Sequence, residues 1–99
     1  MTKHILEVVE FKLNNSVSED TFLSEVHKTN AFVSSLKGFM KRHTAKNETG
    51  LWIDIVEWQD MESAQAAAET FVTSEPAKDF IGMLDQKTIS MQHFEVQII

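Results

Sequence analysis

Apolar and polar residues recur along this chain in a pattern that predicts four strands and three helices. Residues 4–13 have the β-branched and aromatic side chains of a strand, and Asn14 and Asn15 end it. A helix follows, which we expect to begin after the N-cap residue Ser18 and to end at Gly38. Its apolar positions recur at helical spacing: Phe22, Val26, Val33 and Leu36.

The second half of the chain predicts a β-hairpin, two further helices and a last strand. The hairpin turns at residues 47–50, and Asp60 caps an alanine-rich helix that leads to Phe71. Residues 74–76 begin a short third helix, and residues 89–98 form the last strand. The order βαββαβ is typical of the ferredoxin-like α+β class, with a four-stranded antiparallel sheet in the order 4-1-3-2. We therefore expect a single domain that spans residues 1–99.

The second strand of the hairpin is apolar on both faces. Trp52, Val56 and Trp58 share one face, while Ile53 and Ile55 share the other. An antiparallel strand with one face in water would instead alternate between apolar and polar residues. Because the helices of so short a chain can cover only one face, a second copy of the chain is the simplest cover for the other. The sequence therefore predicts a homodimer.

Composition narrows the classes of function. The formal net charge of -6 argues against a nucleic-acid partner or an anionic membrane surface, because both attract cationic proteins. The chain has no cysteine, which fits a reducing compartment, and no apolar run long enough to cross a bilayer. The interleaved charges at the N-terminus do not resemble a secretion signal. We therefore expect a cytoplasmic protein.

Two short segments carry a family resemblance. Residues 36–39 (LKGF) follow the first helix, and residues 57–64 (EWQDMESA) join the hairpin to the second helix. In these segments and in its topology, the chain resembles the dimeric α+β barrel superfamily, and within it the antibiotic-biosynthesis-monooxygenase-like group, with Trp58 matching the tryptophan of that family. The resemblance implies two sheets paired face to face into a barrel that binds a small molecule. It further implies a cofactor-independent monooxygenase of aromatic or quinol-like substrates or, as the alternative, a non-catalytic ligand-binding or stress-related module.

The chain departs from the pattern of that family in its second helix and beyond. Alanines occupy positions 66–68, where members often have a histidine. Phe71 and the pair Phe80-Ile81 are the nearest equivalents of the tryptophan and the iron-ligating histidine of haem-degrading members, so we expect no haem. The chain has no tyrosine, and its three glycines form no nucleotide-binding motif. We therefore expect no cofactor.

One pair of polar residues on the hairpin is a candidate catalytic site. A four-residue loop at positions 47–50 would pair Lys46 with Leu51 and would place His43 directly opposite Asp54. A carboxylate beside an imidazole fixes the tautomer of the ring and prepares it as a general base or a donor to substrate. The alternative is an ordinary cross-strand pair. A shift of register by one residue would separate the two side chains altogether.

Five other residues are candidates for ligand binding: Asn30, Trp52, Trp58, Phe71 and Glu10. The two tryptophans share the face of Asp54 and would form a flat wall for a small aromatic ligand, although Trp58 also suits a packing role at the hairpin-to-helix junction. Asn30 falls within the apolar stripe of the first helix, so its amide would either cap a neighbouring backbone group or face a ligand. Glu10 lies on a central strand, and its alternative is a charge at the strand end that faces solvent.

A metal site is not expected. His93 and Glu95 share one face of the last strand and could approach His4 on a neighbouring strand. Their spacing matches no metal-binding motif, and no second carboxylate lies nearby in the sequence.

Overall fold

The computed structural model describes residues 3–99, so Met1 and Thr2 of the predicted domain lie outside the described residues. Within that range the chain folds into four strands, three α-helices and one short 3₁₀ turn. In chain order these are β1 (Ile5–Phe11), α1 (Glu19–Ser34), β2 (Phe39–Lys46), β3 (Trp52–Trp58), α2 (Met61–Val72), α3 (Glu75–Gly82), η1 (Gln86–Thr88) and β4 (Ser90–Glu95).

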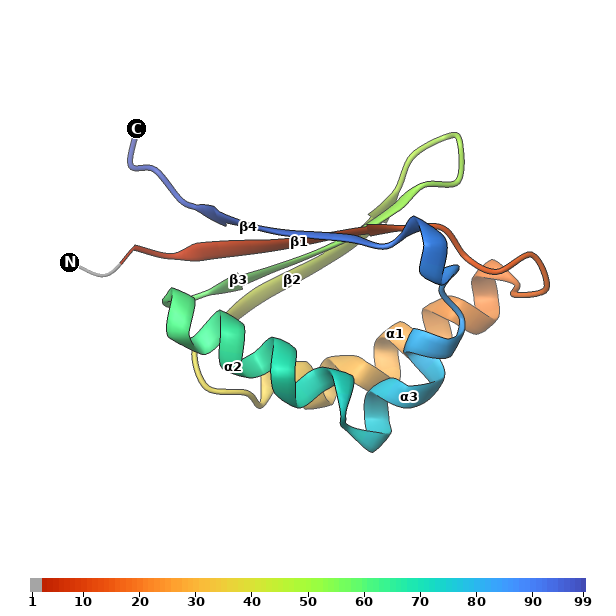
Figure 1. Ribbon diagram of the computed structural model, residues 1–99, viewed down its shortest axis with the longest axis horizontal. Helices are drawn as coiled ribbons and strands as arrows, with labels where there is room; N and C mark the ends of the chain where they lie inside the picture. Colours follow the sequence, from red (N-terminus) through yellow and green to blue (C-terminus); the bar gives the residue numbers. More distant parts are fainter. Residues whose placement is uncertain (1–2) are drawn as a thin grey trace.

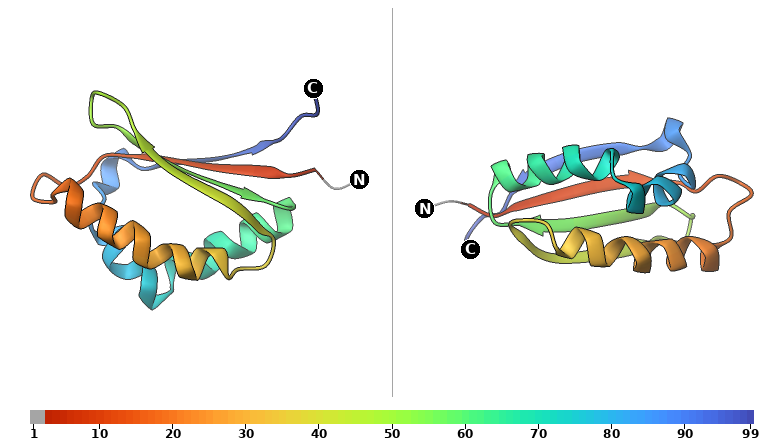
Figure 2. Two further views of the ribbon diagram at one scale, coloured as in Figure 1. Left: turned by 180° about the vertical axis from the view of Figure 1, so that it is seen from behind. Right: turned by 90° about the horizontal axis from the view of Figure 1, so that it is seen from below.

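The four strands form one antiparallel sheet in the order β2-β3-β1-β4, which confirms the predicted order 4-1-3-2 read from the other edge. All three α-helices lie on the same side of this sheet (Figure 1). The view from below in Figure 2 shows α2 over the β1 and β4 side and α1 over the β2 side. No helix of the described chain covers the opposite face of the sheet, which we call the outer face.

The two faces of β3 differ in burial in the way that its sequence predicts. Trp52, Val56 and Trp58 face the helices and are at most 5% exposed, whereas Ile53 and Ile55 on the outer face are half-buried. Aromatic rings fill the end of the core beneath α1 and α3. Phe22 of α1 meets Trp52 edge to face, with ring centroids 4.9 Å apart, an arrangement that aromatic pairs prefer.

Helix α1 begins as predicted and ends earlier than predicted. The Ser18 hydroxyl accepts a hydrogen bond from the Thr21 amide (3.1 Å), which caps the N-terminus. At the other end the hydroxyls of Ser34 and Ser35 donate to the carbonyls of Ala31 (3.2 Å) and Phe32 (2.6 Å). These bonds satisfy carbonyls of the last turn. The prediction that the helix extends to Gly38 is therefore wrong.

The hairpin turn differs by one residue from the prediction. Asn47 pairs with Leu51 through a backbone bond of 2.9 Å, so the loop contains three residues, 48–50, rather than four. The Asn47 side-chain oxygen accepts from the amides of Thr49 and Leu51 (3.0 Å each), and Gly50 has a φ of +86°. A three-residue hairpin loop needs a residue in this left-handed conformation at its end. These bonds make Asn47 the last paired residue of the hairpin. Every cross-strand pair therefore shifts by one residue relative to the prediction.

The loop after β1 is fastened to the end of α3. The Asn14 amide donates to the carbonyl of Met83 (2.9 Å), and its side-chain nitrogen donates to the carbonyls of Gly82 (3.1 Å) and Leu84 (3.3 Å). Leu13 also forms an isolated β-bridge with Leu84. We call this group of contacts the Asn14 clasp. It closes the end of the molecule at which α1 begins and α3 ends.

Candidate functional site

A cavity of about 230 Å³ lies between the helix-covered face of the sheet and the helices. Its apolar walls include Val56 and Trp58 from β3, Val33 from α1, and Ala68 and Phe71 from α2. Ala67 and Ala68 of α2 both line the cavity, and their small side chains leave space that larger residues would fill.

The cavity opens beside the edge strand β4. Three of its lining residues are exposed to solvent: Val72 at the end of α2 (61% exposed), Met91 of β4 (46% exposed) and Gln86 of η1. The opposite end is closed by the aromatic residues that pack beneath α1 and α3. A ligand would therefore enter between the C-terminal end of α2 and β4.

A buried ion pair forms one polar wall of the cavity. Nε and Nη2 of Arg42 donate to the two oxygens of Asp54 at 3.0 and 2.9 Å, and Nη1 donates to the Thr29 hydroxyl at 3.1 Å. The Thr44 hydroxyl donates to Asp54 at 3.2 Å, and the guanidinium lies 5.8 Å from the ring centre of Phe80. The arginine side chain is only 4% exposed. Because its charge is matched by a two-pronged contact, this wall is fixed and formally neutral.

A second polar group lines the cavity from β1, the strand next to the one that carries Asp54. Glu7 of β1 is paired with His93 of the edge strand β4, and its carboxylate accepts a hydrogen bond from Nε2 of that histidine at 3.2 Å. Burial raises the pKa of the Glu7 carboxyl, the nearby Asp54 carboxylate raises it further, and the contact with His93 opposes both effects. Glu7 lines the cavity and holds a proton more firmly than an ordinary glutamate does.

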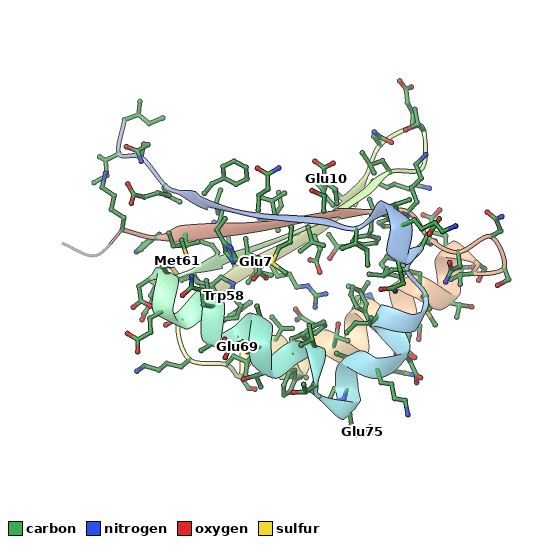
Figure 3. All side chains as sticks on the ribbon, in the orientation of Figure 1. Glu7, Glu10, Trp58, Met61, Glu69 and Glu75 are labelled. Atoms are coloured by element: carbon green, nitrogen blue, oxygen red, sulfur yellow. The ribbon has the colours of Figure 1, made fainter. Side chains whose placement is uncertain are left out.

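Trp58 adds a hydrogen-bond donor without a partner. The residue is 2% exposed, and among the described residues its Nε1 is the buried side-chain polar atom that has no hydrogen-bond partner. Trp58 lines the cavity, and Figure 3 shows it with Glu7 on the helix-covered side of the sheet. A buried N–H without an acceptor costs roughly 1–3 kcal/mol. An oxygen atom of a bound ligand would remove that cost.

The predicted pair of His43 and Asp54 does not form. The ladder places Thr44 opposite Asp54 and His43 opposite Ile55, on the outer face, where the histidine is exposed. The physical reason is the Asn47 turn, which shifts the register by one residue and so moves His43 to the other side of the sheet. Asp54 does face the cavity, but its cationic partner is Arg42.

Asn30 and Glu10 are also placed away from the cavity. Both are exposed, and Figure 3 shows Glu10 on the outer side of the sheet. The buried face of α1 does not include Asn30; its buried residues are Phe22, Glu25, Thr29 and Val33. In β1 the cavity side carries Glu7, which is in phase with Ile5 and Val9, whereas Glu10 is out of phase.

The aromatic candidates divide into two groups. Trp58 and Phe71 line the cavity. Trp52 packs against Phe22, with the Lys46 ammonium 5.8 Å from its ring centre, and does not line the cavity. It therefore contributes packing rather than cavity surface.

Glu7, Arg42 and His93 are the polar residues that the sequence reasoning did not bring together. Strict alternation from Ile5 would have placed Glu7 on the buried face of β1, because Ile5 and Phe11 share that face. Arg42 faces the cavity only in the register that Asn47 imposes, so no pattern in the strand itself identifies it.

The three residues considered for a metal do not meet. His4 lies 3.1 Å from Glu57, whereas His93 contacts Glu7 on the helix-covered face. Among residues 3–99 no three histidine, aspartate or glutamate side chains gather closely enough to hold a metal ion. The described helices also lack the length and apolar character that crossing a membrane requires.

Comparison with known proteins gives matches in structure alone. No family model and no curated protein sequence matches the chain. A single-residue mutant of SnoaB, a cofactor-independent oxygenase from Streptomyces nogalater, superposes with a TM-score of 0.80 at 16% identity, over 99% of this chain and 97% of that protein. SnoaB itself superposes with a TM-score of 0.67 at 15% identity. A candidate antibiotic biosynthesis monooxygenase from Bordetella bronchiseptica superposes with a TM-score of 0.82 at 11% identity, over 98% and 100% of the two chains.

The chain has the fold of the antibiotic biosynthesis monooxygenases. The resemblance predicted from residues 36–39 and 57–64 is thus confirmed at the level of the fold. A dimeric ferredoxin-like protein from Thermobifida fusca has the same fold, with a TM-score of 0.76 at 9% identity over 97% of this chain and 93% of that one. Identities this low leave function to be argued from the site itself.

Proposed function

We propose that this protein binds a small flat aromatic molecule in the cavity between sheet and helices and oxygenates it with O2 without a cofactor. The main support for this proposal is the size and apolar lining of the cavity. An apolar cavity of about 150 Å³ is enough to bind benzene. A volume of about 230 Å³ therefore suits a ligand of one or two fused rings. The structural likeness to SnoaB, itself a cofactor-independent oxygenase, agrees with this reading.

The proposed oxygenation requires few catalytic groups from the protein. An electron-rich aromatic alcohol such as 1-naphthol can give electrons to O2 once its hydroxyl group is deprotonated. The balanced reaction is 1-naphthol plus O2 to 1,4-naphthoquinone plus water, in which one oxygen atom enters the ring and the other leaves as water. The protein contributes dry apolar walls and the Nε1–H of Trp58 as a donor to the ligand oxygen.

Oxygen uptake with 1-naphthol tests this proposal. We expect the protein to accelerate O2 consumption, measured with an oxygen electrode, and to form 1,4-naphthoquinone, identified by chromatography. Ala68→Phe should abolish the acceleration, because Ala68 lines the cavity and a phenyl ring would fill it. The matched control is Ala66→Phe on the exposed side of the same helix, which should retain the parent rate.

Two results would count against this function. One is an O2 uptake equal to that of buffer with 1-naphthol alone. The other is an uptake that Ala68→Phe and Ala66→Phe reduce equally, since the reaction would then not depend on the cavity. Both variants should be checked for the parent far-ultraviolet circular dichroism spectrum before the rates are compared.

The alternative is a non-catalytic ligand-binding or stress-related module of the same fold. The absence of tyrosine and the alanines at positions 66–68 favour it, because few polar groups face a ligand from α2. Binding of 1-naphthol, measured by calorimetry, without any accelerated O2 uptake would support this alternative over the oxygenase.

We also propose that the outer face of the sheet is the interface of a homodimer. Leu6, Val8, Ile53 and Ile55 form a half-buried apolar centre, and Phe94 of β4 is 47% exposed beside Leu6. An apolar face of this kind is uncommon on a monomer. The Thermobifida fusca protein of the same fold is described as dimeric, which agrees with the proposal.

A further inference from the structure

We propose that Glu7 is the proton acceptor for the hydroxyl group of an aromatic ligand in the cavity, with His93 as the residue that positions its carboxylate. The inference rests on the proposed ligand-binding function and adds the residue that would take the proton, so that a phenol or naphthol would bind as its anion. In the proton transfer, the O–H bond of the ligand breaks and an O–H bond forms on the Glu7 carboxylate. No electron moves in this step.

Glu7 borders the cavity and is held in place by a residue of the neighbouring strand. Its carboxylate lines the cavity and is 12% exposed, and one of its oxygens, Oε2, is held by His93 at 3.2 Å. That contact leaves Oε1 free of the histidine. A carboxylate that is held at one oxygen, in a residue that borders a cavity, is placed to act as a general base.

Few charged groups are available to stabilise the ionised form of Glu7. On the helix-covered face, Arg42 is bound through both Nε and Nη2 to Asp54, so its charge is already matched. His93 is the polar group in contact with Glu7, and the residues of α2 that line the cavity are apolar: Ala67, Ala68, Phe71 and Val72. Glu7 is thus a buried carboxylate whose polar contact is His93. The effect of burial exceeds that of this contact, so the pKa of Glu7 is raised and its carboxylate is a stronger proton acceptor than that of an exposed glutamate.

The proton transfer leaves the total charge in the cavity unchanged. When the ligand hydroxyl gives its proton to Glu7, one negative charge leaves the carboxylate and one appears on the ligand. The number of buried charges does not change, so the transfer avoids the large cost of creating a new one. The N–H of Trp58 lies on the neighbouring strand, diagonal to Glu7 because Trp58 is opposite Ile5 and Val56 is opposite Glu7. A ligand oxygen between the two would accept from Trp58 as an anion.

The role of His93 is to hold Glu7 and to connect it to solvent. His93 lies on the edge strand and is 22% exposed, which is more than Glu7. It is not part of the cavity wall, so it acts through Glu7 rather than on the ligand. His93 therefore connects Glu7, at the cavity, to the solvent outside β4.

The test uses 4-nitrophenol, which changes colour on ionisation and is too electron-poor to be a substrate for O2. We expect the bound compound to absorb as its yellow anion in slightly acidic buffer, where the free compound is mostly neutral. Glu7→Gln should bind it with the absorbance of the neutral form, with the anionic fraction lowered at least about tenfold, the equivalent of one pKa unit. Glu10→Gln is the matched control, because that glutamate lies on the same strand with its side chain on the outer face.

Two further measurements isolate the roles of the two residues. 4-Nitroanisole, which has no proton to lose, should bind equally to the parent and to Glu7→Gln, which shows that the cavity is intact. The contact with His93 lowers the pKa of Glu7, so its loss would by itself favour the ligand anion, and a positioning role has the opposite signature. For that role, His93→Leu should lower the anionic fraction, and His93→Gln, which keeps a donor, should restore most of it and return the pH profile towards that of the parent. A higher anionic fraction in His93→Leu would overturn the positioning role.

The outcomes separate this inference from the proposed function. An anion that persists in Glu7→Gln, or a bound phenol that is neutral in the parent, overturns the role of Glu7 whatever happens to O2. Anionic 4-nitrophenol together with no O2 uptake from 1-naphthol supports the role of Glu7 and removes the oxygenase. A parent protein that binds neither nitro compound overturns both proposals.

Discussion

Arg42 and Asp54 illustrate how strongly a buried charge depends on its partner. The arginine side chain is 4% exposed and the aspartate side chain 12%, and two hydrogen bonds join them. Asp54→Ala would leave the guanidinium buried without a counter-charge, so we expect a loss of about 3–5 kcal/mol in the free energy of unfolding. Urea denaturation followed by tryptophan fluorescence would measure it.

A paired substitution provides the control. Arg42→Met in combination with Asp54→Leu removes both charges together, so the double variant should recover most of the stability that Asp54→Ala loses. If the double variant were less stable than Asp54→Ala, the loss would come from packing and the charge argument would be wrong.

Glu7 should leave a signature in the dependence of stability on pH. Burial raises the pKa of this carboxyl in the folded protein, so the folded state holds the proton more firmly than the unfolded state. The resulting stability is fully present below the ordinary pKa of glutamate and is lost as the pH rises through the folded value. The unfolding free energy of the parent minus that of Glu7→Gln should therefore fall with rising pH above the ordinary glutamate range.

Denaturant midpoints of both proteins at a series of pH values would measure this difference. Glu10→Gln, on the outer face, serves as the reference for the loss of one carboxylate. A difference between the parent and Glu7→Gln that stays constant or grows with pH would contradict the raised pKa.

The polar residues of the site were only partly predictable from the sequence, and the reason lies in one side chain. Asn47 can end a strand or join it, and the strand pattern around it fits both cases. In the structure it accepts from the Thr49 and Leu51 amides and joins the ladder. That choice exchanges His43 for Arg42 on the cavity side. Asp54 could be assigned to the buried face without the turn, because its neighbours Trp52 and Val56 define that face.

The turn between α1 and β2 depends on Gly38 for two separate reasons. Its φ is +87°, and a Cβ there would overlap the Cβ and Oγ of Ser63 at the start of α2. Gly50 has nearly the same φ, +86°, with open space around it. We expect Gly50→Ala to cost about 1–2 kcal/mol from the left-handed backbone alone. Gly38→Ala should cost measurably more, because the clash adds to that strain.

Thermal or urea unfolding of the two variants would measure the difference. Ser63→Gly in the Gly38→Ala background removes the atoms that clash, so the two substitutions together should cost less than the sum of their separate effects. Equal losses in Gly38→Ala and Gly50→Ala would mean that the turn moves freely away from α2.

The strands and helices were more predictable than their ends. The N-caps Ser18 and Asp60 both accept the hydrogen bonds that their residue types suggest, from the amides of Thr21 and Ser63. The end of α1 was missed because Ser34 and Ser35 bond to the carbonyls of the last turn before Gly38 is reached. Such bonds depend on side-chain rotamers, which apolar spacing does not report. The strands β1 and β4 are likewise shorter than residues 4–13 and 89–98.

The apolar outer face of the sheet makes the state of association a direct test. We expect light scattering at micromolar concentration to give about twice the chain mass of 11.3 kDa. Ile55→Glu should shift the mass towards that of one chain, because it places a carboxylate in the centre of the proposed interface.

The control is Met61→Glu, which replaces an exposed apolar residue at the start of α2, away from that face. It should leave the mass unchanged. A parent protein that is a stable monomer at this concentration would exclude the dimer, and a dimer that persists in Ile55→Glu would place the interface elsewhere.

The Asn14 clasp gives α3 an unusual dependence on a distant part of the chain. A helix of eight residues is too short to persist in water alone. Asn14, about 70 residues earlier in the sequence, binds the carbonyl of its last residue, Gly82, and that of Leu84 just beyond it. The amide protons of α3 should therefore exchange with solvent only when the segment after β1 detaches as well. Their exchange rates would then report the cooperative opening of α3 and the loop after β1, rather than the fraying of one short helix.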